Sequence, residues 1–308
     1  MCKTVAVIDI GTQTARLLVA NADEQKVKLE PVARDIRGVR LGEGVDALGH
    51  LSQAAMARAA DAVADFARQA RALGAVEIYA FATSATRDAA NQDELISLLQ
   101  QRAGVALDVL DGEQEAQVAF RGAVGLRPGI QGVIDIGGGS TEVLIGRDGK
   151  PLFSRSLQMG AVRAGERFGC FGVQAYDALR AGVEEMFRNL AQEIAALALP
   201  APCWTGVAGT LTTLAMWQLG LGQYQPEKVQ DFMLTAQDTG RLADKLYRMD
   251  REARLGIPGL APYRADIIGP GSGIASSLMQ ALGIGEIRIS DSDNLEGYLY
   301  QKVLHALK

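Results

Sequence analysis

The sequence predicts an α/β protein built from two duplicated domains, each a mixed sheet flanked by helices. One observation behind this prediction is a strand–loop–strand pattern that occurs near the N-terminus and again near the middle of the chain. The other is that helices and strands alternate after each copy. Because a single core stops growing at about 250–300 residues, a chain of 308 residues is expected to form two domains.

The repeated pattern spans Ile8–Val19 in its first copy and Ile134–Ile145 in its second. Each copy reads as an apolar strand, an aspartate, a glycine-containing turn with hydroxyl side chains, and a second apolar strand, which is typical of a hairpin. Two unrelated hairpins could share some of these features by coincidence. The agreement of aspartate, glycine, hydroxyl and apolar positions favours duplication, with both hairpin tips facing one cleft.

In the first half, a strand is expected over 26–41, followed by a turn at 42–44. Ser52 is expected to cap a long helix that ends at Ala72, because apolar residues then recur at helical spacing and Gly74 follows. The remaining elements expected in this half are a strand at 76–82, a helix at 93–102, a strand at 105–110 and a helix at 113–124.

The boundary between the halves is expected at Leu126–Gln131, which contains Pro128 and Gly129. The predicted domains are therefore 1–126 and 127–308, with a closing helix at about 295–308 that packs back on the first domain. The elements expected in the second half are strands at 151–158, 203–207 and 286–290, and helices at 174–197, 209–218, 235–249, 273–282 and 295–307.

The composition is that of an ordinary globular protein, with 48% hydrophobic and 22% charged residues. A net charge of −5 supplies no global positive field, so nucleic acid is not an expected partner. No apolar run approaches the ~20 residues that cross a bilayer, and the N-terminus leads directly into a strand without a signal peptide. The cysteine count is odd, at three, with no C-x-x-C pair. We therefore expect a cytoplasmic location without a disulfide framework.

The second hairpin carries the pattern with the most chemistry. Asp135 and Glu142 flank the run Gly137-Gly138-Gly139-Ser140-Thr141. Glycines let the backbone approach a phosphate closely, and their N–H groups can form an anion-binding concavity. Mg²⁺ needs only one or two carboxylates in addition to water and phosphate. The alternative is a plain glycine-rich hairpin with solvated acids. Arg16 occupies the position in the first copy that Glu142 occupies in the second.

Three further segments follow predicted strands. Arg87 lies in a hydroxyl-rich segment, and arginine binds phosphate with two parallel hydrogen bonds, which favours a phosphate site here over the alternative of an ordinary helix cap. Glu115 lies in a first helical turn, where acids are usually placed only to favour the helix dipole; the alternative is a base that takes a proton from an attacking water. Gly209-Thr210 precedes a helix and is either a phosphate site or an ordinary turn.

Together these segments resemble the exopolyphosphatase / guanosine pentaphosphate phosphohydrolase family, within the actin, sugar kinase and heat-shock ATPase superfamily. The segments that carry the resemblance are 7–11, 82–87, 112–116, 133–145, 159–163, 208–210, 257–260, 264–266, 290–291 and 296–297. They run along almost the whole chain. The chain resembles the short two-domain form of the family.

The resemblance implies two ribonuclease H-like (actin-like ATPase) domains with mixed five-stranded sheets and an interdomain cleft. It implies Glu115 as the general base and Asp135 and Glu142 as ligands of Mg²⁺, with Mn²⁺ as a substitute. The residues expected to bind phosphate are Gly11, Thr12, Gln13, Thr14, Arg16, Arg87, Gly137, Gly138, Gly139, Ser140, Thr141, Gly209 and Thr210. The expected partners are inorganic polyphosphate or guanosine pentaphosphate, with a homodimer as a further option, and neither nucleic acid nor membrane.

Three positions depart from the family pattern, and they bear on substrate choice. Gln13 stands where the family commonly has asparagine, Gln230 where it often has histidine, and Leu295 where it usually has arginine. The leading hypothesis is release of terminal phosphate from polyphosphate. Hydrolysis of the 5′-terminal phosphate of guanosine pentaphosphate, a kinase activity, and a non-catalytic sensor of phosphate chains remain as alternatives.

Overall fold

The computed structural model describes residues 2–11, 14–25, 28–43, 45, 49–125 and 127–303, except for the side chains of Ser84 and Tyr263. The chain divides into two compact units. Unit 1 comprises Met1–Gly125 with Asn294–Lys308, and unit 2 comprises Leu126–Asp293. Each unit is described below by itself. Thr12 and Gln13 lie outside the described residues.

Unit 1 contains a five-stranded mixed sheet in the order β3-β2-β1-β4-β5. Its strands are β1 (Cys2–Ile10), β2 (Thr14–Asp23), β3 (Lys28–Gly38), β4 (Glu77–Ala82) and β5 (Leu107–Val109). β1, β2 and β3 pair antiparallel, whereas β4 and β5 add parallel to β1. The predicted first hairpin is therefore β1–β2, and this sheet has the expected number of strands.

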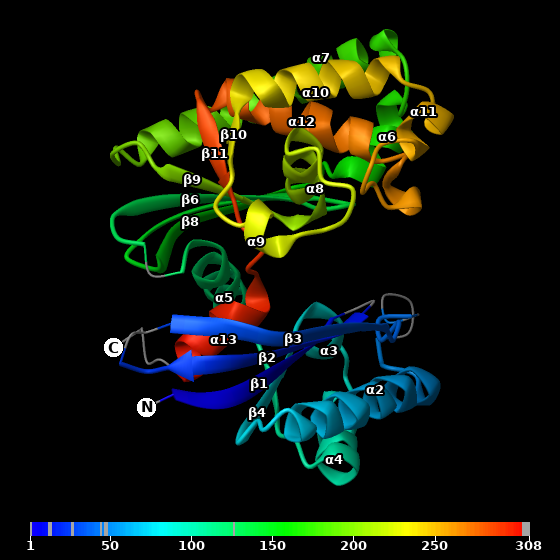
Figure 1. The fold of residues 1–308 in the computed structure, drawn as a ribbon, viewed down its shortest axis with the longest axis vertical. Helices are drawn as coiled ribbons and strands as arrows, with labels where there is room; N and C mark the ends of the chain where they lie inside the picture. Colours follow the sequence, from blue (N-terminus) through cyan, green and yellow to red (C-terminus); the bar gives the residue numbers. More distant parts are fainter. Residues whose placement is uncertain are drawn as a thin grey trace. The chain divides into compact units, whose positions relative to one another are not determined.

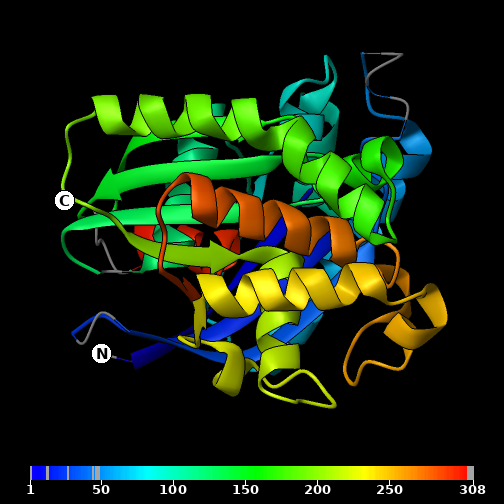
Figure 2. The same cartoon turned by 90° about the horizontal axis from the view of Figure 1, so that it is seen from above.

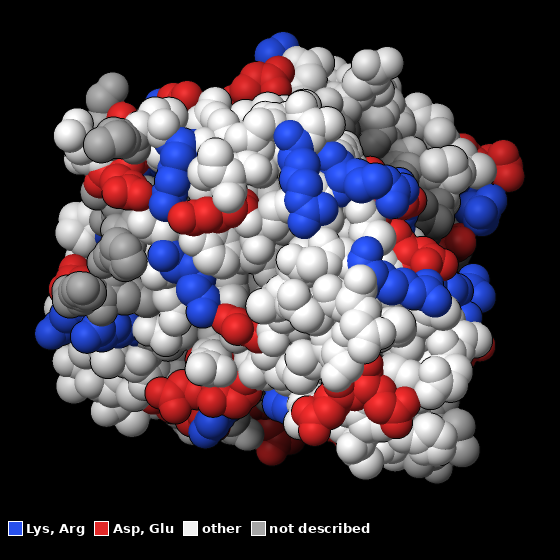
Figure 3. Space-filling model, turned by 90° about the horizontal axis from the view of Figure 1, so that it is seen from below, with Lys and Arg blue, Asp and Glu red and all other residues white. Residues whose placement is uncertain are grey.

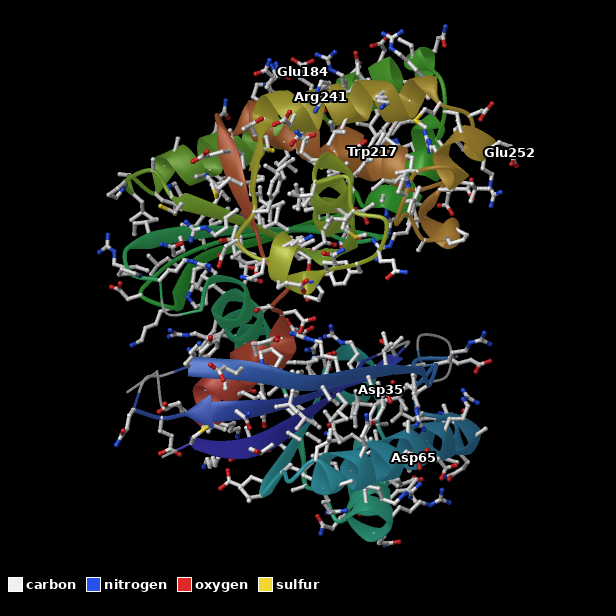
Figure 4. The ribbon with its side chains drawn as sticks, viewed as in Figure 1. Asp35, Asp65, Glu184, Trp217, Arg241 and Glu252 are labelled. Atoms are coloured by element: carbon white, nitrogen blue, oxygen red, sulfur yellow. The ribbon has the colours of Figure 1, made fainter. Side chains whose placement is uncertain are left out.

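Helices cover both faces of this sheet (Figure 1). They are α2 (Gln53–Ala72), α3 (Ser84–Arg87), α4 (Gln92–Ala103), α5 (Gly112–Val124) and α13 (Asn294–Lys302). α2 begins as predicted, because the Ser52 hydroxyl accepts a hydrogen bond from the backbone N–H of Ala55 at 3.2 Å. An ion pair between Arg37 of β3 and Asp65 of α2 joins this helix to the edge strand; Asp65 is labelled in Figure 4.

α13 packs against α5 and contacts β1 and β2 in unit 1. Gly297 permits the close approach, since a Cβ atom there would lie 1.9 Å from the carbonyl oxygen of Val118 on α5. The ring of Tyr298 stacks on Phe81 with centroids 4.7 Å apart. Its hydroxyl donates a hydrogen bond to Asp108 at 2.5 Å. These contacts make α13 part of the core of unit 1.

Unit 2 contains a mixed sheet in the order β10-β11-β9-β6-β7-β8. Its strands are β6 (Ile130–Ile136), β7 (Thr141–Arg147), β8 (Lys150–Leu157), β9 (Cys203–Val207), β10 (Met233–Thr235) and β11 (Glu286–Ile289). Strands β8-β7-β6-β9-β11 repeat the order and directions of the unit 1 sheet. The antiparallel edge strand β10 is an addition, so this sheet has six strands where five were expected.

The helices of unit 2 are α6 (Ala161–Phe168), α7 (Val173–Ala196), α8 (Ala208–Gln218), α9 (Pro226–Val229), α10 (Ala236–Arg248), α11 (Arg251–Leu255), α12 (Ile268–Ala281) and the short 3₁₀ helix η1 (Pro262–Arg264). Figure 2 shows α7, α12 and α10 side by side, with α12 in the middle. α12 begins at Ile268 and not at the predicted Gly273. Pro270 does not prevent the earlier start, because it lies in the first turn of the helix, where proline is tolerated.

Candidate functional site

The hairpin β6–β7 places two acids opposite each other. Asp135 and Glu142 are register partners across the antiparallel pair, and both are half-buried. The Ser156 hydroxyl donates a hydrogen bond to Oε1 of Glu142 at 2.8 Å. Like charges at directly opposed positions destabilise a sheet. A cation between the two carboxylates removes this repulsion, and oxygen ligands suit a hard divalent ion.

The hairpin β1–β2 has the same backbone with the opposite charge pattern. Asp9 and Arg16 hold the corresponding register positions. The guanidinium of Arg16 donates two hydrogen bonds to Oδ2 of Asp9, the one from Nε at 3.0 Å. The turns match as well, because the N–H of Gly11 donates to the carbonyl of Thr14 at 2.9 Å. This hairpin therefore carries its own counter-charge.

The turn of the second hairpin offers backbone donors to solvent. The N–H of Gly137 donates to the carbonyl of Ser140 at 3.0 Å, which repeats the turn of the first hairpin. Gly138 and Gly139 are exposed. Within the described ranges, the N–H groups of Gly138, Gly139 and Ser140 make no hydrogen bond. The hydroxyl of Thr141 is buried and donates to the carbonyl of Met159 at 2.6 Å, so that side chain holds the loop in place.

Glu115 and Arg87 meet in unit 1. A capping box of Asp111 and Gln114 starts α5 and sets the position of Glu115 in its first turn. Nη1 of Arg87 donates to Oε2 of Glu115 at 3.0 Å and to the carbonyl of Leu110 at 3.2 Å. The hydrogen bond with Glu115 raises the pKa of Arg87, so the guanidinium stays charged. Nε of Arg87 donates to Oδ1 of Asp88 at 3.3 Å, and Nη2 makes no hydrogen bond within the described part of the chain, which leaves that nitrogen for an anion.

Arg264, for which the sequence predicts no role, lies beside Gly209. A Cβ atom on Gly209 would lie 1.8 Å from Nη1 of Arg264, so the guanidinium lies directly against this glycine at the start of α8. Thr210, by contrast, is buried, and its hydroxyl lies 3.3 Å from the carbonyl of Ile136, to which it donates. Arg264 therefore supplies a cation beside Gly209, whereas Thr210 offers only its backbone.

Two of the departures from the family pattern have structural roles. Oε1 of Gln230 accepts a hydrogen bond from the backbone N–H of Asp291 at 2.9 Å, and it fixes the segment that follows β11. Leu295 is 2% exposed and belongs to the core between α13 and the unit 1 sheet. At position 295 an apolar core residue thus replaces the cation of the family pattern.

The charges and carboxylates of the described residues limit the kinds of site that the chain offers. No group of three or more histidine, cysteine or acidic side chains in the described ranges has the geometry of a metal cluster. Acidic and basic side chains are interspersed on the face drawn in Figure 3. Because charges of both signs are mixed there, an anion must be bound by local donors.

Within the same described part, every helix is too short or too polar to span a membrane.

Comparison with known proteins identifies the family. A model of the Ppx/GppA phosphatase family matches residues 18–306. The chain belongs to the Ppx/GppA phosphatase family. Among curated relatives, exopolyphosphatase 2 of Mycobacterium tuberculosis is 33% identical, with 95% of this chain and 96% of that protein covered. A putative exopolyphosphatase of Haemophilus influenzae is 27% identical, over 97% of this chain and 91% of the relative.

Solved structures of Ppx/GppA proteins have the same fold. The type II variant of the Aquifex aeolicus Ppx/GppA phosphatase superposes with a TM-score of 0.88 at 26% identity, covering 98% of this chain and 100% of the other. An exopolyphosphatase from Cytophaga hutchinsonii gives a TM-score of 0.75 at 28% identity, with 99% of each chain covered. The predicted family, the fold class and the assignment to phosphatases are confirmed. The roles of individual site residues and the predicted domain limits stay predictions.

Proposed function

We propose that this Ppx/GppA protein hydrolyses the terminal phosphoanhydride bond of inorganic polyphosphate with the help of a divalent metal ion. The observation that carries the proposal is the register opposition of Asp135 and Glu142 beside an exposed run of glycine N–H groups. This arrangement supplies oxygen ligands for a cation and backbone donors for the anion that the cation accompanies.

In the proposal, Asp135 and Glu142 hold Mg²⁺, with Mn²⁺ as a substitute. Two carboxylates fit Mg²⁺, which commonly keeps several waters and binds substrate phosphates in its remaining positions. A bound divalent ion neutralises charge that develops on the phosphoryl oxygens during transfer. The hydrogen bond from Ser156 to Glu142 orients this carboxylate.

The phosphate chain is proposed to bind through backbone N–H groups and arginines. In unit 2 these are the loop from Gly137 to Thr141, the start of α8 at Gly209 and Thr210, and the guanidinium of Arg264 beside Gly209. In unit 1 they are Arg87, Arg16, Gly11 and Thr14, together with the predicted Thr12 and Gln13. Arginine suits phosphate because its fork of donors matches two oxygens at once.

Glu115 is proposed as the base. Its carboxylate takes a proton from the attacking water while the water oxygen forms a bond to the terminal phosphorus. The bond from phosphorus to the bridging oxygen breaks, and the bridging oxygen leaves with the electron pair on a chain shortened by one unit. The products are orthophosphate and the shorter polyphosphate. The ion pair with Arg87 holds Glu115 in place.

The decisive experiment measures orthophosphate release from long polyphosphate, short polyphosphate and guanosine pentaphosphate, with and without Mg²⁺. Glu115→Gln is expected to reduce release by about 10²- to 10⁴-fold, the usual contribution of a positioned base. Glu113→Gln is the matched control, because Glu113 is an exposed acid in the same helical turn. Full activity of the Glu115→Gln variant would defeat the assignment.

The same assay separates the alternatives. Guanosine pentaphosphate carries the same type of terminal bond, so a higher rate on it than on polyphosphate would reassign the substrate. Phosphorylation of an acceptor with ATP, without release from polyphosphate, would indicate a kinase. Tight binding of polyphosphate with no turnover at any Mg²⁺ concentration would indicate a sensor.

A further inference from the structure

The first turn of α6 binds the carbonyl groups of all three glycines in the loop between β6 and β7. The N–H of Ala161 donates to the carbonyl of Gly137 at 2.9 Å, and the N–H of Val162 donates to that of Gly138 at 2.8 Å. The carbonyl of Gly139 accepts from Nε of the Arg163 side chain at 3.0 Å. These bonds attach the glycine loop to the N-terminus of α6.

The N-terminal N–H groups of a helix lack partners within the helix, and many helices satisfy them with a capping side chain or an anion. In α6 the loop carbonyls take that place, and the N-cap residue Gly160 provides no side-chain cap. A Cβ atom on Gly160 would lie 2.5 Å from the carbonyl group of Gly138 and from the nitrogen of Ser140. Glycine at position 160 therefore allows α6 to start against the loop.

The direction of these carbonyls fixes the direction of the loop N–H groups. In a trans peptide, the C=O of one residue and the N–H of the next point in opposite directions. The carbonyls of Gly137 and Gly138 point toward the backbone of α6 and that of Gly139 toward the Arg163 side chain, so the N–H groups of Gly138, Gly139 and Ser140 point away from these partners. This agrees with the exposure of Gly138 and Gly139. The result is a row of three donors that point away from the groups bound by the loop carbonyls.

The last donor of this row depends on one side chain. Backbone N–H groups of α6 hold the first two glycine carbonyls. Within the described ranges, the Gly139 carbonyl accepts only from Arg163. That carbonyl shares a peptide plane with the N–H of Ser140, so without Arg163 the plane can rotate and turn this N–H away from an anion.

We propose that Arg163 is a positioning residue for the phosphate-binding loop, acting through Nε on the Gly139 carbonyl and not through contact with substrate. This proposal rests on the proposed function, because it assumes that the loop binds phosphate. It differs from two other roles for an exposed arginine. One is direct attraction of the anion by the positive charge, and the other is a contribution to fold stability alone.

Two substitutions separate these roles. In Arg163→Gln the side-chain amide nitrogen is the same number of bonds from Cα as Nε of arginine, so the donor remains and the charge is lost. In Arg163→Met a similar length remains, but both donor and charge are lost. Arg167→Gln is the control, since Arg167 is an exposed arginine one turn further along α6, with its guanidinium 5.1 Å from the Phe168 ring centroid.

The experiment uses the full chain with Mg²⁺ and three readouts. These are calorimetric binding of orthophosphate, the KM and kcat for tripolyphosphate, and the backbone order parameters of the amides from Gly138 to Ser140, measured by nitrogen-15 relaxation. Arg163→Met is expected to weaken orthophosphate binding and raise the KM up to roughly tenfold, about the upper value of one ordinary hydrogen bond. The order parameter of the Ser140 amide should fall, because the peptide plane is no longer held. Arg163→Gln and Arg167→Gln should stay close to wild type in all three readouts.

Equal loss of binding in Arg163→Gln and Arg163→Met would overturn the proposal, because the charge and not the donor would then matter. A lower melting temperature of Arg163→Met with unchanged anion binding and unchanged loop order parameters would also overturn it, because the role would be structural. Failure of the proposed function is a different result. The wild type would then release no phosphate from polyphosphate, whereas the comparison of order parameters, which needs no substrate, would still decide whether Arg163 holds the loop.

Discussion

Asp135 and Glu142 face each other across β6 and β7, whereas Arg16 faces Asp9 at the corresponding positions of β1 and β2. The two hairpins share their turn hydrogen bond and their strand order. One position in the repeat therefore decides whether an acid in a hairpin faces a cation or a second acid.

Removing one of the opposed acids should stabilise the metal-free protein and abolish its response to metal. We expect Glu142→Gln to raise the free energy of unfolding in EDTA by about 0.2–1 kcal/mol, the usual size of a cross-strand charge effect. Mg²⁺ should raise the urea concentration at the midpoint of unfolding for the wild type, because it binds only the folded state. It should leave the midpoint of the variant unchanged. Asp177→Asn, an exposed acid on α7, is the control. An equal response of Glu142→Gln and wild type to Mg²⁺ would contradict a metal site here.

Gly209→Ala should displace Arg264 with little effect on stability. The new Cβ would fall 1.8 Å from Nη1 of Arg264, and the end of a flexible side chain can move aside. Alanine also has the higher helix propensity, by about 1 kcal/mol. We expect the free energy of unfolding to stay within about 1 kcal/mol while the KM for polyphosphate rises. Arg264→Gln should give the same rise, and the double variant no further rise. Additive effects in steady-state kinetics would show that the two residues act separately.

Gly297→Ala should weaken the attachment of α13 to α5. The added methyl would lie 1.9 Å from the Val118 carbonyl and 2.8 Å from the nitrogen of Gly122, both backbone atoms. Overpacking of this kind usually costs about 1–3 kcal/mol. Urea unfolding should show that loss, and limited proteolysis should cut near the C-terminus first. In Gly38→Ala, where a Cβ atom has open space around it, neither measurement should change.

The attachment of α13 should also weaken in acid. Burial acts to raise the pKa of Asp108, but hydrogen bonds from Lys302 and Tyr298 outweigh it and hold the pKa below its ordinary 3.8. Burial, followed by the hydrogen bond to Asp108, raises the pKa of Tyr298, which therefore stays protonated as the donor. A lowered carboxyl pKa adds stability that is complete above the unfolded-state value and is lost as the pH falls through the folded-state value.

The stability difference between wild type and Asp108→Asn should therefore be constant from about pH 5 to 8 and shrink below the ordinary pKa. Because Asp108 is 46% exposed, the difference should not exceed about 1 kcal/mol. Urea unfolding measured between neutral pH and about pH 3 tests this dependence. A difference that grows on acidification would mean that the hydrogen bonds to Asp108 do not lower its pKa.

The sequence predicts the duplicated architecture because the hairpin repeat is local and periodic. Elements that form because of tertiary packing cannot be predicted from the sequence in this way. Gly269, Pro270 and Gly271 look like helix breakers, yet they form the start of α12. A Cβ at Gly269 would lie 2.5 Å from the buried guanidinium of Arg254, and one at Gly271 would lie 2.8 Å from Thr210. These glycines allow close packing, which a propensity argument cannot detect.

The candidate site shows the same limit. Spacing alone identifies the opposed acids of the second hairpin, since its strands are adjacent in sequence. It does not reveal that Arg264 lies against Gly209, because the two are far apart in the chain. Nor does it reveal that the hydroxyls of Thr141 and Thr210 donate to backbone carbonyls, because a hydroxyl beside a glycine looks the same in sequence whether it faces a ligand or the core.

Unit 1 is assembled from both ends of the chain, with α13 covering Val5 and Phe81 of its sheet. During synthesis from the N-terminus, every residue of unit 2 leaves the ribosome before α13 does. Apolar residues on one face of the nascent sheet therefore stay exposed until α13 has been synthesised, and exposed apolar surface favours aggregation. A ribosome stalled within unit 2 should leave a chain that depends on chaperones, whereas a finished chain can bury this face at once.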